Sequence, residues 1–192
     1  MTTSRVPLLS SEEAKRAAAE VELFELKANF SIYRVLLRQP LVAKRLSDLT
    51  DVLVGASHID ARLRELLIMR LGWANRGVYE WSQHWKIALL HDGIEKSDLL
   101  AIRDWEVHDH WSPRDRAAFR ATDETLEHGV LSKETWSEVA QHFPTHEERI
   151  ELVTIISCWK MLSDIMKTLE VPLDEGVEPW LPDGLEPPGP QL

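Results

Sequence analysis

Apolar residues recur every three or four positions along almost the whole chain, a spacing typical of amphipathic helices. The period-two alternation of a half-buried strand is not sustained in any segment. The pattern therefore predicts an all-α fold. The predicted helices cover about 11–29, 30–38, 41–53, a long stretch from 61 to 93, 94–103, 113–128, 133–143 and 146–170.

Several predicted helix starts have a recognisable N-terminal cap. Asp60 and Thr145 can each accept a hydrogen bond from the first turn, and Ser112 is followed by Pro113, which suits the first helical position. The long stretch from 61 to 93 contains Gly72, Asn75 and Gly77, three poor helix formers within six residues. We therefore expect a tight turn there and a helical hairpin.

The end of the chain changes character after the last predicted helix. That helix should bury the face formed by Ile150, Val153, Ile156, Met161, Ile165 and Leu169. Six prolines and three glycines follow within residues 171–192, which excludes a regular helix. We expect an N-terminal helix within residues 1–28, one helical domain over 29–173, and an arm over 174–192 that is extended, wraps a neighbouring subunit, or is solvated.

The charge balance excludes some classes of partner. Against 22 Lys and Arg stand 32 Asp and Glu, a formal net charge of −10, which opposes binding to nucleic acid or to an anionic membrane. No stretch approaches the roughly 20 apolar residues of a membrane span, and the start of the sequence does not resemble a signal peptide. We expect a cytoplasmic protein.

Cysteine chemistry is restricted to one residue. With Cys158 alone, an intrachain disulfide, a thiolate metal cluster and a dithiol mechanism are all excluded. Cys158 lies among large apolar residues, so we expect a small buried side chain rather than a nucleophile.

One segment carries residues suited to acid–base chemistry. Glu80 and His84 are four residues apart and share one face of a helix, and Glu65 precedes them in the first arm of the predicted hairpin, from which it can fold back on either. Two carboxyl groups and an imidazole in one pocket would form an acid–base set. The alternative is an ordinary surface pair of Glu80 and His84.

The stretch from Glu65 to His84, with the turn His91-Asp92-Gly93-Ile94 after it, is similar to the signature of the carboxymuconolactone decarboxylase family. In the peroxidase branch of that family, a glutamate stands twelve residues before a Cys-x-x-Cys-x-x-x-His segment. When this sequence is set against that spacing, Gly77 and Glu80 occupy the two cysteine positions. The Tyr-Glu-Trp form at 79–81 recurs in non-peroxidase members, and the likeness extends over about 29–173.

The resemblance implies a fold and an assembly. It implies an alkylhydroperoxidase-D-like helical hairpin fold in a single domain that forms trimers or hexamers, and we expect Leu66, Met69 and Leu71 to be buried partly by this self-association. It also implies a small-molecule substrate, without a metal or a cofactor.

The resemblance further implies a carboxy-lyase that acts on an unsaturated carboxylated lactone or a related organic acid. His84 would donate the proton or bind the oxyanion, Glu80 would orient His84 or act as base, and Glu65 would be a second acid or a support. Tyr79 would donate to an oxyanion, and an aromatic wall would comprise Trp73, Trp81 and Trp85.

Other functions remain open at this point. The same groups would serve lactone hydrolysis, hydration or double-bond isomerisation, and a non-catalytic oligomeric binding protein would need none of them. Peroxidase activity is disfavoured because the cysteine pair is missing, which leaves only Cys158 for thiol chemistry with a partner protein. His108 and His110 form a His-x-His loop that resembles part of a metal site, but no further ligand motif accompanies it.

Overall fold

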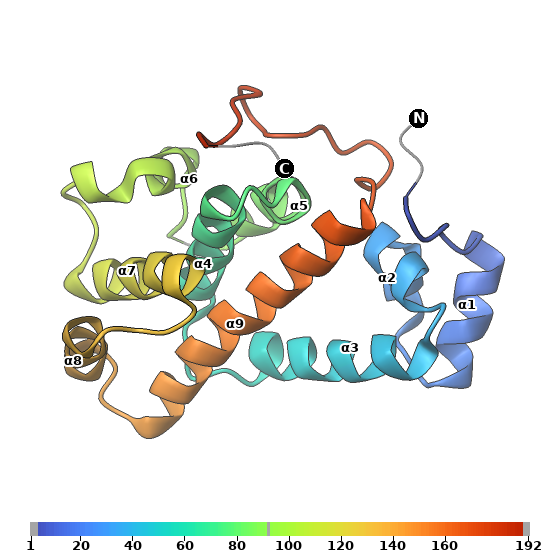
Figure 1. The fold of residues 1–192 in the computed structure, drawn as a ribbon, viewed down its shortest axis with the longest axis horizontal. Coiled ribbons are helices and arrows are strands. Elements are labelled where there is room, and N and C mark those ends of the chain that lie inside the picture. The colour runs from blue at the N-terminus through green and yellow to red at the C-terminus, as the bar shows by residue number, and fades with distance from the viewer. Residues whose placement is uncertain (1–3, 92, 190–192) are drawn as a thin grey trace.

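The computed structural model describes residues 4–91 and 93–189, and in this part of the chain every regular element is helical, as predicted (Figure 1). There are nine α-helices and two short 3-10 helices over these ranges. The α-helices are α1 (Ser11–Glu20), α2 (Ser31–Leu36), α3 (Pro40–Gly55), α4 (Ala61–Ala74), α5 (Val78–Ala88), α6 (Lys96–Ala101), α7 (Pro113–His128), α8 (Lys133–His142) and α9 (His146–Leu169), and the 3-10 helices are η1 (Glu25–Asn29) and η2 (Ile102–Val107).

The α4–α5 hairpin lies at the centre of the molecule. The long helix α9 crosses beside it, α3 runs below, and α6, α7 and α8 lie on the side opposite α1 and α2 (Figure 1). Helix α4 contacts α5, α7 and α9, so most of its residues are buried. Leu66, Met69 and Leu71 are already almost fully buried within one chain, so the expectation that self-association buries them is wrong.

The helix starts follow the caps read from the sequence. The carboxylate of Asp60 accepts a hydrogen bond of 2.9 Å from the Leu63 N–H. Ser112 and Thr145 each form a reciprocal capping box with the third residue of their helix. Because these contacts are local in sequence, they set helix starts independently of the rest of the fold.

The predicted helix over 11–29 is wrong, because α1 ends at Glu20. The backbone turns at Glu22 (φ +54°), and the Leu23 N–H donates to the Ala18 carbonyl at 2.9 Å. This reversal buries Leu23 against Ala14 and Ala18, which a continued helix would not do.

The predicted core face of α9 is also largely wrong. Ile156 is buried, but Ile150 is 67% exposed, and Val153 and Met161 are exposed as well. Apolar residues occur on more than one side of α9, so their period alone does not select the buried side. The side that packs inward comprises Leu152, Ile155, Ile156, Cys158, Trp159, Leu162, Ser163 and Met166.

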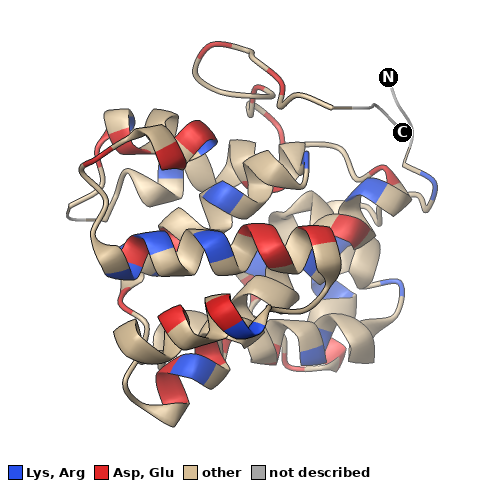
Figure 2. Ribbon diagram, turned by 60° about the vertical axis from the view of Figure 1, so that its left-hand side comes forward, with Lys and Arg blue, Asp and Glu red and all other residues tan. Residues whose placement is uncertain are grey.

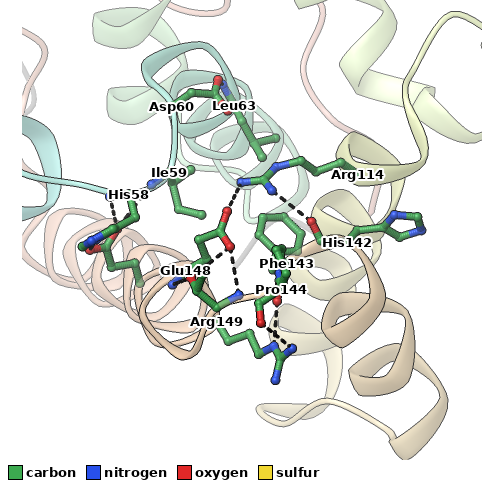
Figure 3. Close-up of polar contacts among 12 residues, drawn as sticks. His58, Ile59, Asp60, Leu63, Arg114, His142, Phe143, Pro144, Glu148 and Arg149 are labelled. Atoms are coloured by element: carbon green, nitrogen blue, oxygen red, sulfur yellow. Dashed lines mark hydrogen bonds and ion pairs between the residues drawn. The ribbon is translucent and has the colours of Figure 1, made fainter.

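Polar contacts join the start of α9 to its neighbours (Figure 3). The Arg114 guanidinium of α7 donates to the His142 carbonyl and to Glu148, both at 2.9 Å. Arg149 donates to the Phe143 carbonyl at 2.7 Å. These bonds satisfy carbonyl groups at the end of α8 and fix the direction in which α9 leaves the α8–α9 turn.

The segment after α9 runs back across α5 of its own chain (Figure 1). We call residues 171–189 the arm.

Acidic and basic residues alternate along the same helices rather than separating onto different faces (Figure 2). None of the described helices is long and apolar enough to cross a membrane.

Candidate active site

The turn between α4 and α5 brings the two helices unusually close. The Gly77 N–H donates to the Gly72 carbonyl at 2.7 Å, and Arg76 adopts a positive φ of 53°. A Cβ placed on Gly72 would lie 3.0 Å from the backbone nitrogen of Trp81, so glycine permits the close packing of α4 on α5. The predicted hairpin is confirmed, with its break at residues 75–77.

The hairpin places Glu65 of α4 against His84 of α5. Their Oε2 and Nδ1 atoms are 2.8 Å apart, and the carboxyl group is only 3% exposed. Arg64 and His91 approach the other carboxylate oxygen at 3.6 Å and 4.0 Å. Burial opposes ionisation of Glu65, but the hydrogen bond with His84 and the neighbouring charges hold its pKa below the ordinary value. An ionised Glu65 therefore orients the His84 ring through Nδ1 and leaves Nε2 for another partner.

Glu80 has a different environment although it lies one helical turn from His84. Its side chain is 2% exposed, and neither carboxyl oxygen makes a well-formed hydrogen bond to a described residue. Burial raises the pKa of Glu80 to about 8, despite opposing effects of its own backbone N–H, of Ser163 and of Lys167. Near neutral pH this carboxyl group is therefore mainly protonated and can donate a proton.

A pocket of about 750 Å³ lies beside Glu80. Three parts of the fold enclose it: the α4–α5 hairpin, the C-terminal end of α9, and segments from both ends of the described chain. Neither Glu65 nor His84 is among its lining residues, so the three predicted acid–base residues do not all face this cavity. Its lining includes Arg5, Asn75, Arg76, Gly77, Tyr79, Glu80, Asp164, Lys167, Glu170, Val171, Trp180 and Glu186.

The cationic groups around this pocket are paired with acidic ones. Lys167 Nζ donates to the carbonyl and the side-chain oxygen of Asn75, both at 2.9 Å, and lies 3.1 Å from Asp164. Arg5 pairs with Glu170 at 2.9 Å in a largely exposed contact. Arg76 forms a second ion pair, with Glu186 at 3.4 Å, and this contact is partly exposed. The pocket border is thus rich in charge but locally balanced.

Tyr79 holds the arm in place. Its hydroxyl group lies 3.2 Å from both carboxylate oxygens of Asp174, which also accepts from Gln83 and from the Ser31 N–H at 2.6 Å. Burial and the charge of Asp174 raise the pKa of Tyr79, so the phenol keeps its proton. That single proton is directed at Asp174 rather than at a substrate oxyanion.

The predicted aromatic wall is a core cluster under the arm. The rings of Trp73 and Trp81 lie 5.1 Å apart, those of Trp81 and Trp85 lie 5.6 Å apart, and all three are buried. Trp81 Nε1 donates to the Leu181 carbonyl at 2.6 Å. The tryptophan that does line the pocket is Trp180 of the arm, which packs edge-on against Trp73 at 6.0 Å.

Two other sites considered from the sequence have simpler explanations. His108 and His110 contact different carboxylates, Asp104 and Asp98, each at 3.2 Å. No group of three or more potential metal ligands is found in the part of the chain that the structure describes. Cys158 is buried, and burial raises its pKa to about 11, so the thiolate needed for peroxide reduction is disfavoured.

The sequence between Pro40 and Glu124 matches the model of the carboxymuconolactone decarboxylase family. This stretch, a little under half of the chain, is similar to that family. The match to the carboxymuconolactone decarboxylase family contains Glu65, Glu80 and His84, whereas α8, α9 and the arm follow it. A comparison with curated protein sequences finds no significant match.

Solved structures share the fold of this chain. An uncharacterized peroxidase-related protein from Ralstonia eutropha JMP134 with an alkylhydroperoxidase AhpD core has a TM-score of 0.73 at 15% identity, over 91% of this chain and 94% of its own. A cysteine-to-alanine variant of the debrominase Bmp8, in complex with 2,3,4-tribromopyrrole, has a TM-score of 0.71 at 19% identity over the same shares. A peroxidase-related protein from Silicibacter sp. TM1040 has a TM-score of 0.67 at 9% identity, over 91% of each chain.

Spacing along one hairpin selected Glu65, Glu80 and His84, but it gave no signal for the residues contributed by other elements. Ser163 and Lys167 come from α9, and Trp180 comes from the arm. A serine within an otherwise apolar helix face was the one available indication of Ser163.

Proposed function

We propose that this chain is a cofactor-free acid–base enzyme that acts on a small unsaturated organic acid, in the first place as a carboxy-lyase on a carboxylated lactone. The observation that carries this proposal is Glu80, a buried carboxyl group that borders a pocket and has a pKa of about 8. A protonated carboxylic acid without a settled hydrogen-bond partner is costly to bury, and such groups cluster at sites of catalysis.

The chemistry of decarboxylation matches what this acid can supply. The carbon–carbon bond to the carboxylate breaks, carbon dioxide leaves, and the electron pair is delocalised as a dienolate. One proton must then be added to carbon. In the proposal Glu80 donates this proton and regains another from solvent, so neither a metal nor a cofactor is required.

The Glu65–His84 pair supplies a second proton carrier one turn along α5. The carboxylate fixes the imidazole through a 2.8 Å contact at Nδ1, which leaves Nε2 to accept a proton and, once protonated, to donate a hydrogen bond to an enolate oxygen. Because His84 does not line the pocket described above, this role requires the substrate to extend from Glu80 toward His84.

The substrate carboxylate would be received at the charged border of the pocket. The ion pairs Arg5–Glu170 and Arg76–Glu186 are partly exposed, and such pairs contribute little stability. An incoming carboxylate can therefore replace the acidic partner of either arginine at small cost.

A peroxidase mechanism is not proposed, because Gly77 and Glu80 stand at the two cysteine positions and Cys158 is buried. Self-association into trimers or hexamers is proposed separately, through faces other than Leu66, Met69 and Leu71.

Hydrolysis, hydration and isomerisation of the same substrates are the alternative reactions, and they differ from decarboxylation in their products.

The test is a screen of carboxylated lactones and ring-fission acids by ultraviolet absorbance, with carbon dioxide release measured for any substrate found. Glu80→Gln and His84→Ala are each expected to lower kcat by about 10² to 10⁴-fold, the usual contribution of a general acid or base. Glu134→Gln, which alters an exposed glutamate, is the control and should leave turnover unchanged. Folded variants at positions 80 and 84 that turn over substrate at the wild-type rate would overturn the proposal.

A further inference from the structure

Ser163 of α9 is a buried hydroxyl group without a settled partner. Its side chain has no exposed surface, and Oγ makes no well-formed hydrogen bond to a described residue. Buried side-chain oxygens in native proteins are nearly always bonded, so each exception calls for an explanation. Glu80, on the neighbouring α5, has two such oxygens.

Three other hydroxyl groups within helices form a bond that Ser163 does not form. Thr122, Ser137 and Thr154 each donate to the carbonyl four residues earlier, at 3.0 Å, 2.9 Å and 2.7 Å. This back-bonding is the usual way in which a helical serine or threonine satisfies its hydroxyl group. No such bond is formed by Ser163, whose hydroxyl group is available for another partner.

Ser163 and Glu80 converge on Gly77. A Cβ placed on Gly77 would lie 2.6 Å from Ser163 Oγ and 2.7 Å from Glu80 Oε2. Glycine at this position therefore leaves space for both oxygens, which come from different helices.

We infer that Ser163 is a positioning residue for Glu80, whose hydroxyl group accepts a hydrogen bond from the protonated carboxyl group and donates one to the ionised carboxylate. A hydroxyl group can do both because it has one donor and two acceptor sites and rotates about a single bond. When Glu80 gives its proton to a substrate, the Ser163 hydrogen turns toward the carboxylate, and it turns away again when solvent returns a proton. This role rests on the proposed function of Glu80 as a proton donor.

Other charged groups also act on Glu80, and they do not replace this partner. Lys167 favours the ionised form, whereas Asp164 disfavours it, and both lie on α9. Tyr79 neighbours Glu80 on α5 but directs its proton at Asp174. The face of α4 against Glu80 is formed by Gly72, which carries no charge. The remaining charged groups border the pocket and are Arg5, Arg76, Glu170 and Glu186.

The experiment measures the titration of Glu80 directly and without substrate. Carbon-13 NMR of glutamate labelled at the side-chain carboxyl carbon follows each carboxyl group with pH, and the signal missing from Glu80→Gln identifies Glu80. Ser163→Ala removes a donor to the carboxylate, so the titration midpoint should rise by up to about one pH unit, a tenfold fall in the acid dissociation constant. Ser163→Cys, with a weaker hydrogen-bonding group, should give an intermediate value.

The matched control is Thr154→Val, which removes a back-bonded hydroxyl group on the same helix and should leave the midpoint in place. An unchanged midpoint in folded Ser163→Ala, or an equal shift in Thr154→Val, would overturn the role of Ser163. A shifted midpoint in a protein that turns over no substrate would instead support that role and count against the proposed function.

Discussion

A buried glutamic acid such as Glu80 makes the stability of the protein depend on pH. Its pKa is about 8 in the folded chain and near 4.5 when it is exposed to water. Between these values the folded state binds more protons than the unfolded state, so stability falls as pH rises. Below the lower pKa both states carry this proton, and well above the upper pKa neither state does. Outside this range Glu80 therefore adds no pH dependence to the stability.

The difference in stability between Glu80→Gln and the wild type is therefore expected to change with pH, in favour of the variant as the pH is raised. Between about pH 5 and pH 8 the free energy of unfolding of the wild type should fall by up to about 1.4 kcal/mol per pH unit relative to Glu80→Gln. Urea unfolding of both proteins across this range measures the difference. The exposed variant Glu134→Gln should follow the wild type, and parallel curves for all three proteins would contradict a raised pKa at Glu80.

The candidate acid–base residues could be selected from the spacing within one hairpin, but the sequence left their pairing open. Four-residue spacing favoured a contact between Glu80 and His84, and the hairpin allowed Glu65 to meet either of them. In the structure, His84 contacts Glu65 across the turn. Local spacing places residues on a face. Which neighbour a side chain meets depends on how α4 packs against α5, which no short segment specifies.

At the scale of the helices, the α4–α5 turn is the element on which the site geometry depends. Gly77 caps α5 with a φ of −82°, a backbone conformation that any residue can adopt. A side chain at this position is excluded only because the oxygens of Ser163 and Glu80 occupy the adjacent space.

Gly77→Ala should consequently destabilise the protein by about 1–3 kcal/mol, the usual cost of an overpacked site. Gly55→Ala is the matched control, because a Cβ on Gly55, at the end of α3, meets nothing within 4 Å. It should be neutral or slightly stabilising. Thermal unfolding of the two variants compares them, and equal melting temperatures would show that the space at Gly77 is not constrained.

Helix starts were the most predictable features, whereas the burial of helix faces was not. Asp60, Ser112 and Thr145 act on backbone groups three residues away, so sequence alone reveals them. The orientation of α9 depends on contacts with α4, α5 and α7, and exposed Ile150 shows that an apolar residue at helical spacing can still face outward.

For the molecule as a whole, Asp174 holds the start of the arm to α5, whereas Trp180 and Leu181 hold its middle through bonds with Ser82 and Trp81. This carboxylate accepts hydrogen bonds from Ser31, Tyr79 and Gln83, which belong to two different helices. The sequence predicted an irregular segment from its prolines and glycines, but its path depends on these contacts between residues distant in sequence, which composition cannot specify.

Asp174→Ala is expected to cost about 2–4 kcal/mol, because three donors, two of them partly buried side chains, lose their partner. The start of the arm should then move away from α5, so the tryptophan emission, to which buried Trp73 and Trp81 contribute, should shift to longer wavelength at temperatures where the helices remain folded. Glu175→Ala, at the adjacent exposed position, is the control. Identical emission spectra for the two variants would show that Asp174 does not hold the arm.

The pocket beside Glu80 has walls of two different kinds. Packed helices carry Glu80, the proposed proton donor, whereas Trp180 and Glu186 belong to an irregular segment, and such segments tolerate substitution and insertion more readily. Changes in the arm can therefore alter which molecules fit without disturbing the residues that are proposed to move protons. Related proteins that keep the hairpin but differ after α9 would, by the same reasoning, share a reaction type and diverge in substrate preference.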